Sequence, residues 1–249
     1  MEIKSLVLAS ILMIIPIYIS NKEKLGLEKD IIVSIVRAIV QLVAIGFILK
    51  YIFAINNTLI TILLILVMII NASINTKKSG KNINHRVKIS FLALLISSSV
   101  TLLVLVASKA ITFTPDNIIP VAGMIISNSM VAIGLTYRTL TSSFNERRAE
   151  IETKLSLGAD IKKSSRAILR KTVKLALAPN IDSAKTLGIV SLPGMMTGLI
   201  LGGASPITAI KFQIIVTFMM MSGSSLAIII STYIAYKSFF NKRSQLIYC

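Results

Sequence analysis

The residues of this chain that could do chemistry are polar side chains placed inside long apolar runs. Arg37 and Gln41 are four residues apart, a spacing that puts both on one face of a helix. Asn71, Asn128 and Gln213 place amides within or at the ends of three further runs. Polar groups inside a membrane face a bundle interior or a cavity, so this set predicts a translocation path. The alternative is that the amides form hydrogen bonds between helices and that Arg37 reaches the membrane interface.

The stretch "LGIVSLPGMMTGLILGGASP" combines a proline with regularly spaced glycines. Proline removes a backbone donor, and glycines at every fourth position line one helix face with small residues. The pattern fits either close helix packing or a broken helix whose freed carbonyls line the path. Under the second interpretation the path includes Pro193, Gly194, Met195 and Met196.

Ligands for a metal ion are scarce in the sequence. The thioethers of Met195, Met196 and the run Met219–Met221 are soft ligands that suit Cu(I) better than Fe(II). Adjacent methionines point to different faces of a helix, which favours filling gaps in a core. His85 has no partner at ligand spacing, the single cysteine is Cys249, and none of the 10 acidic residues lies inside an apolar run. The metal ligands therefore stay unknown. Either a metal crosses as a complex with other ligands, or the substrate is something else.

The composition places these residues in a membrane. Hydrophobic residues make up 54% of the 249 and charged residues only 15%, far too apolar for an ordinary soluble domain. The formal charge of +17 is spread between apolar runs, whereas a nucleic-acid-binding protein concentrates it on a polar domain. We therefore expect the lipid bilayer, and no nucleic acid, as a partner.

Seven runs are long enough to cross about 30 Å of hydrocarbon, which takes roughly 20 residues. The first could instead be a signal peptide, but no small-residue cleavage site follows it, so we expect a retained helix. The sequence predicts an all-α polytopic protein with about seven transmembrane helices in a single permease domain over 1–249. The runs lie near residues 3–19, 31–53, 58–74, 89–107, 118–136, 186–204 and 212–236.

Lysine and arginine are distributed unevenly among the loops. If the N-terminus is outside, 21 of them fall on the inner side, and only Lys4, Lys109 and Lys211 fall on the outer side. Basic loops stay in the cytoplasm. The distribution therefore predicts an odd number of spans, with the N-terminus out and the C-terminus in.

The segment 138–180, between the fifth and sixth runs, is charged and helix-prone. It holds ten basic and four acidic residues, and Ile168, Leu169 and Val173 lie on the half of a helical wheel opposite most of the basic ones. Such an amphipathic helix could lie along the membrane surface. Alternatively, Gly158 could close a turn between two short helices, because glycine accepts the positive φ that such a turn needs.

The second alternative resembles a cytoplasmic motif of ABC-transporter permeases. That motif runs Glu-Ala-Ala, three residues, glycine, nine residues, isoleucine, one residue and Leu-Pro. Glu152, Gly158 and Ile168 stand at these spacings, although the two alanines and the Leu-Pro are replaced. The resemblance implies that a separate ATPase docks on this segment, with Glu152, Leu157, Gly158 and Ala159 at the contact.

Further blocks along the chain resemble the FetB (YbbM) family. That family comprises permease subunits of a bacterial ABC transporter associated with iron export. The resemblance implies a multi-pass protein of the bacterial inner membrane that forms a homodimer and works with a FetA-type ATP-binding subunit. The blocks are "KEKLGLEKDI" (22–31), "RAIVQLVAIGFILKYIF" (37–53), "IPVAGMIISNSMVAIGL" (119–135), "KLSLGA" (154–159) and "DSAKTLGIVSLPGMMTGLILGGASPITAIKFQI" (182–214).

A partner is expected because the chain has no phosphate-binding loop for ATP. The lone "SGKN" at 79–82 lacks both the upstream glycine and the following hydroxyl residue. We therefore expect a permease without catalytic residues or a cofactor of its own, with ATP and Mg²⁺ on the partner. Three alternatives stay open: an ABC permease for a non-metal substrate such as a nucleotide sugar, a secondary transporter, and a membrane scaffold.

Overall fold

The computed structural model describes residues 10–55, 57–80, 83–241 and 243–247, and these are helical with no strand among them. The all-α prediction is therefore confirmed for this part of the chain. The chain divides into two units, residues 1–56 and residues 57–249. The helices, in order, are η1 (Ile11–Met13), α2 (Ile14–Lys22), α3 (Glu28–Ile55), α4 (Thr58–Asn75), η2 (Thr76–Lys78), α5 (Arg86–Ala107), α6 (Pro115–Glu146), α7 (Arg148–Ser156), α8 (Ile161–Thr186), α9 (Gly194–Leu201), α10 (Pro206–Ala235) and η3 (Tyr236–Phe239).

The first unit is a hairpin of α2 and α3. The hydroxyl of Ser20 donates to Oε1 of Glu28 at 2.8 Å and accepts from the backbone N–H of Leu27 at 3.1 Å, so it holds the start of α3 against the end of α2. The intervening turn passes through Gly26, whose φ of 67° suits glycine. The predicted first run, 3–19, lies partly outside the described residues, which begin here at Ser10.

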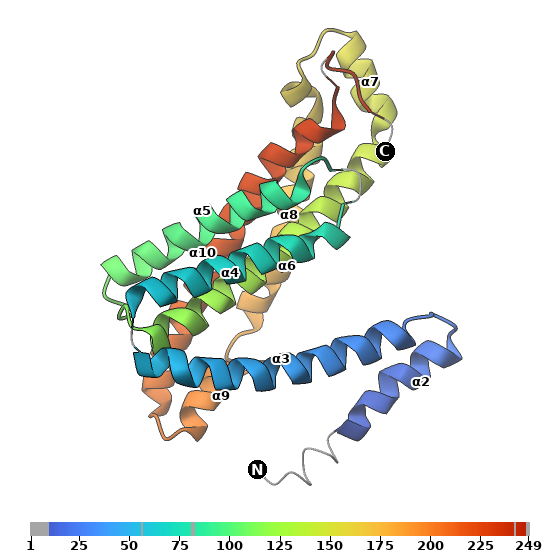
Figure 1. The fold of residues 1–249 in the computed structure, drawn as a ribbon. Coiled ribbons are helices and arrows are strands. Elements are labelled where there is room, and N and C mark those ends of the chain that lie inside the picture. The colour runs from blue at the N-terminus through green and yellow to red at the C-terminus, as the bar shows by residue number, and fades with distance from the viewer. Residues whose placement is uncertain (1–9, 56, 81–82, 242, 248–249) are drawn as a thin grey trace. The chain divides into compact units, whose positions relative to one another are not determined.

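The second unit is an elongated bundle of α4, α5, α6, α8 and α10 (Figure 1). Its main hydrophobic core is contributed by all five helices and is completed by aromatic residues near the C-terminus. Phe239 stacks on Phe144 with ring centroids 4.3 Å apart and planes 3° apart. This stack fastens the segment after α10 to the last turn of α6.

Five helices among the described residues are long and apolar enough to cross a membrane: Glu28–Ile55, Thr58–Lys78, Arg86–Ala107, Pro115–Glu146 and Pro206–Phe239. They contain the second, third, fourth, fifth and seventh predicted runs. The prediction of a continuous span over 186–204 is wrong. Helix α8 ends at Thr186, a turn follows, and α9 has eight residues, about 12 Å at 1.5 Å per residue.

The return across the bundle is made by α8 instead. Ten residues into α8, Lys171 pairs with Glu146 at the end of α6, and towards the end of α8 Ala184 borders the same cavity as Met124 on α6. Between these points Ala176 packs against Ala132 of α6 and Ile228 of α10. The chain thus travels from one end of α6 back along most of its length before α10 begins.

The interpretation of α8 as a helix lying on the membrane surface is also wrong, because its apolar side is covered by protein. Ile168 and Leu169 are buried in the main core, and Thr172 and Ala176 are buried beside them. Helices α6 and α10 cover this side (Figure 1). The low hydropathy of α8 comes from its many lysine and arginine residues, together with small and hydroxyl-bearing residues on the covered side.

Three of the four basic segments expected on the inner side gather at one end of the second unit. The hydroxyl of Ser238 lies 3.5 Å from the carbonyl of Asn84, which joins the tail to the α4–α5 connection. Helix α7 and the C-terminal segment lie at this same end, and α9 lies at the other (Figure 1). The sequence predicts these three segments on the same side of the membrane, and the structure brings them to the same end of the bundle. Which end faces the cytoplasm stays a prediction.

Candidate functional site

The turn between α7 and α8 is built around Gly158, whose φ is +84°. The N–H of Gly158 donates to the carbonyl of Leu155, and the N–H of Ala159 donates to the carbonyl of Lys154, both at 3.0 Å. This pair of hydrogen bonds is a Schellman motif, which satisfies the last carbonyls of a helix and places glycine in the left-handed region. The predicted turn between two helices is therefore confirmed in geometry, although only α7 is short and α8 has 26 residues.

The four predicted coupling residues surround this turn. Glu152, Gly158 and Ala159 border a cavity of about 680 Å³, whose opposite wall is the C-terminal segment 243–246. Leu157 does not line the cavity, and at 82% exposure it projects from the tip of the turn. Glu152 accepts from Nε of Arg148 at 2.8 Å. The structure thus provides an exposed tip beside a cavity, while contact with an ATPase stays a prediction.

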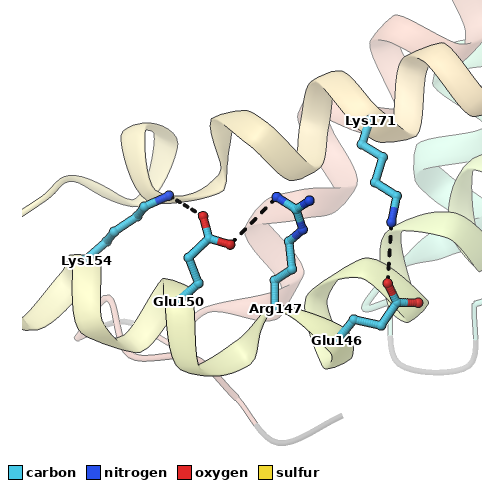
Figure 2. Close-up of polar contacts among 5 residues, drawn as sticks. All are labelled: Glu146, Arg147, Glu150, Lys154 and Lys171. Carbon is cyan, nitrogen blue, oxygen red and sulfur yellow. Dashed lines mark hydrogen bonds and ion pairs between the residues drawn. The ribbon is translucent and has the colours of Figure 1, made fainter.

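Ion pairs hold α7 and connect α6 to α8 (Figure 2). Glu150 lies between Arg147 and Lys154, and Lys171 of α8 reaches across to Glu146 at 3.4 Å. The hydrogen bond from Lys154, followed by the charges of Lys154 and Arg147, lowers the pKa of the Glu150 carboxyl below its ordinary 4.5. Because the Glu150 side chain is exposed to solvent, these contacts orient α7 more than they stabilise it.

The Glu150 carboxyl should titrate below pH 4.5, and Lys154→Met should raise its midpoint, because the substitution removes the largest cause of the lowered pKa. A group whose pKa is lowered by folding contributes stability above its unfolded pKa and loses that contribution as pH falls through the folded pKa. The carboxyl ¹³C shift of Glu150, followed by NMR in nanodiscs, measures both midpoints. An unchanged midpoint in Lys154→Met would show that Lys154 does not lower the pKa of Glu150.

A second cavity, of about 350 Å³, lies between α6, the C-terminal half of α8, α10 and the segment that leads into α9. None of the described residues that line it is charged. It is bordered by Met124, Asn180, Ser183, Ala184, Leu187, Ser191, Pro193, Gly194, Met195, Gln213, Val216, Thr217, Met220 and Met221.

The second cavity, which we call the polar pocket, brings together four of the nine residues predicted for the translocation path: Pro193, Gly194, Met195 and Gln213. Met196 follows Met195 but does not line the pocket.

The other predicted path residues are not among those that line the pocket. Asn128 turns back on its own helix and donates to the carbonyl of Met124 at 3.3 Å. Asn71 accepts from Nδ2 of Asn75 at 3.1 Å on the exposed side of α4. Arg37 and Gln41 are on α3 of the first unit, so their part in a path stays a prediction.

Several lining residues were not among those predicted from the sequence. Asn180 of α8 donates to the hydroxyl of Ser224 on α10 at 2.6 Å, and that hydroxyl donates to the carbonyl of Met220. Asn180 was missed because the segment 138–180 was assigned to the cytoplasm. A usable signal is Pro179 beside it, since a proline inside a helix leaves a carbonyl without its backbone donor.

The amide of Gln213 provides an unsatisfied acceptor at the wall of the pocket. Its Oε1 is buried and has no hydrogen-bond partner among the described residues. An unsatisfied buried acceptor costs about 1–3 kcal/mol. A bound group that donates a hydrogen bond to this oxygen, or a cation placed beside it, is therefore favoured. In the described part of the chain, no group of three or more His, Cys, Asp or Glu residues is placed to hold a metal ion.

Comparison with known proteins identifies the family. A model described as "Uncharacterised protein family (UPF0014)" matches residues 3–240. The chain is 47% identical over 244 residues to "Probable iron export permease protein FetB" of Escherichia coli strain K12, covering 98% of this chain and 94% of that protein. It is 38% identical over 240 residues to "UPF0014 membrane protein STAR2" of Oryza sativa subsp. japonica, covering 96% and 84%.

A third relative, "Protein ALUMINUM SENSITIVE 3" of Arabidopsis thaliana, is 35% identical over 238 residues, covering 96% of this chain and 87% of that protein. No solved structure matches the chain. The matches extend over nearly the whole sequence and include the protein named FetB, so the resemblance noted from the sequence blocks is confirmed. The chain belongs to the UPF0014 family of membrane proteins.

Proposed function

We propose that this chain is the membrane-spanning permease subunit of an ABC transporter in the bacterial inner membrane. In this proposal two copies work with two FetA-type ATP-binding subunits, which bind the ATP and Mg²⁺. The substrate is iron or a related metal species, which is exported. Support for the substrate comes from the relative named as a probable iron export permease, which is 47% identical to this chain.

The observation that carries the proposal is the course of α8. This helix begins two residues after the Gly158–Ala159 turn and continues through Ile161–Thr186 to the polar pocket. At 1.5 Å per residue, its 26 residues extend about 39 Å. A helix transmits a displacement at one end to the other because its backbone is hydrogen-bonded along its length, and in α8 Pro179 interrupts this pattern at one position only. Movement of the exposed turn by an ATPase would therefore reach Asn180 and Ser183 directly.

Charges on the outer side of α8 support a path between two copies. Asp182 and Lys185 pair at 3.0 Å, and their side chains are 68% and 69% exposed. They flank Ser183 and Ala184, which border the same cavity as Met124 of the apolar helix α6. Charges at membrane depth face water or protein rather than lipid. An aqueous path bounded by a second copy would satisfy this requirement.

Coexpression with the candidate ATP-binding subunit tests the proposal. The permease should copurify with it in equal amounts, and proteoliposomes should move labelled iron only when ATP is supplied. A partner with its hydrolytic glutamate replaced by glutamine serves as the control that binds but does not hydrolyse. Flux without ATP would favour a secondary transporter, and failure of the two subunits to associate would favour a scaffold, so either result overturns the proposal.

A further inference from the structure

The polar pocket is bordered by four methionines that come from three separate parts of the chain. Met124 lies on α6, Met195 on the first turn of α9, and Met220 and Met221 on α10. All four are half-buried, so their side chains border the hollow without being sealed in the core. Their convergence is a feature of the fold, because α6 ends at Glu146 and α10 begins only at Pro206.

Neighbouring methionines behave differently. Met219 is only 2% exposed and belongs to a hydrophobic core cluster, against which Met124, Met195 and Met220 also pack on one side, and Met196 does not line the pocket. A methionine that fills a gap in a core is expected to look like Met219, with its thioether enclosed by apolar atoms. The four pocket methionines instead surround a space of about 350 Å³. Gap-filling therefore accounts fully for Met219, whereas the four pocket methionines also border open space.

We propose that the polar pocket is a thioether site that binds a soft monovalent cation of the Cu(I) and Ag(I) class. Methionine sulfur is a soft ligand that selects Cu(I), whereas carboxylate and imidazole, which suit harder ions, are missing from the described lining residues. The lining is uncharged, and the cost of moving an ion out of water rises with the square of its charge. A monovalent ion fits such a site better than a divalent one.

The amides of the pocket complete the proposed site. Oε1 of Gln213 is buried without a hydrogen-bond partner in the described part of the chain, so it can face a cation with no competing donor. The amide of Asn180 donates to Ser224, which fixes that side chain at the wall of the pocket. This site goes beyond the proposed iron export, and it requires neither the ATPase nor transport to be detected.

Cu(I) binding by the purified permease alone, in detergent, tests the proposal. Under reducing conditions the protein is titrated against a chromogenic Cu(I) chelator, and copper X-ray absorption reports whether sulfur surrounds the metal. One Cu(I) per chain with sulfur ligation is expected. Replacing Met124, Met195, Met220 and Met221 together by leucine, which preserves side-chain volume, should weaken binding by about 100-fold or more, since leucine offers no ligand.

The matched control is the double variant Met196→Leu/Met219→Leu, which removes two neighbouring thioethers that do not line the pocket. It should bind Cu(I) as the unchanged protein does. Fold integrity of each variant is checked by its elution as a single species and by its helical circular dichroism. Equal loss in the control and the pocket variant, absence of Cu(I) binding, or binding of Fe(II) in preference to Cu(I) would overturn the proposal.

Failure here and failure of the proposed function are distinguishable. The copper experiment uses the permease without its partner, whereas the proposed function is tested by association with an ATPase and by ATP-dependent flux. A permease that binds Cu(I) but never associates with an ATPase would leave the thioether site in place and remove the transporter proposal. The opposite result would remove only the thioether site.

Discussion

Gly158→Val should strongly weaken the coupling of ATP hydrolysis to transport, whereas Gly158→Asn should retain most of it. The φ of Gly158 is +84°, and a Cβ built there meets nothing within 4 Å. The penalty of substitution is therefore a backbone penalty alone, about 1–2 kcal/mol for an ordinary residue and larger for a β-branched one. Asparagine tolerates this region of φ better, so it should keep the turn.

The measurement is ATP hydrolysis and substrate flux by the reconstituted permease–ATPase complex. We expect Gly158→Val to lower coupled flux by at least about tenfold, which corresponds to roughly 1.4 kcal/mol. Gly203→Val is the matched control, because Gly203 has a φ of +94°, also meets nothing within 4 Å, and lies after α9, away from the turn. Equal loss in Gly203→Val, or normal coupling in Gly158→Val, would contradict a role for this turn.

The long apolar spans of this fold could be predicted because their hydropathy does not depend on tertiary contacts. Helices α4, α5 and α10 coincide with apolar runs that no soluble helix would sustain. The crossing by α8 could not be found in this way. Its uncovered side is rich in lysine and arginine, and its buried side carries Ser164, Ser165 and Thr172 against neighbouring helices. Its hydropathy is therefore low although one side is packed in the interior.

The same reasoning explains which parts of the candidate site could be predicted. Gly158 was found because a positive-φ turn has a residue requirement that can be read locally. The polar pocket was found only in part, since Pro193 and Gln213 are unusual within apolar runs, whereas Asn180 lies in a charged segment where an asparagine is ordinary. The convergence of Met124 with Met220 and Met221 depends on how α6 packs against α10, which spacing along the chain does not determine.

Gly223 is a point inside the bundle that is sensitive to added volume. A Cβ at this position would lie 2.9 Å from Cγ2 of Ile125, 3.5 Å from Oγ1 of Thr101 and 3.6 Å from Oγ of Ser129. Three helices, α5, α6 and α10, therefore meet at the missing side chain. Ile125 is fully buried and its Cγ2 is attached directly to Cβ, so it cannot move aside without shifting α6.

Gly223→Ala should lower the free energy of unfolding by about 1–2 kcal/mol, because overpacking costs about 1–3 kcal/mol and the gain in helix propensity over glycine offsets up to about 1 kcal/mol. Equilibrium unfolding in mixed micelles with increasing SDS measures the change. Gly123→Ala on α6 is the control, since its Cβ meets only the flexible end of Met68 at 3.1 Å and the helix gain should prevail. Ile125→Leu removes the opposing Cγ2, so the double variant with Gly223→Ala should be more stable than the sum of the two single changes implies. A neutral Gly223→Ala, or simple additivity in the double variant, would show that the three helices can separate at this contact.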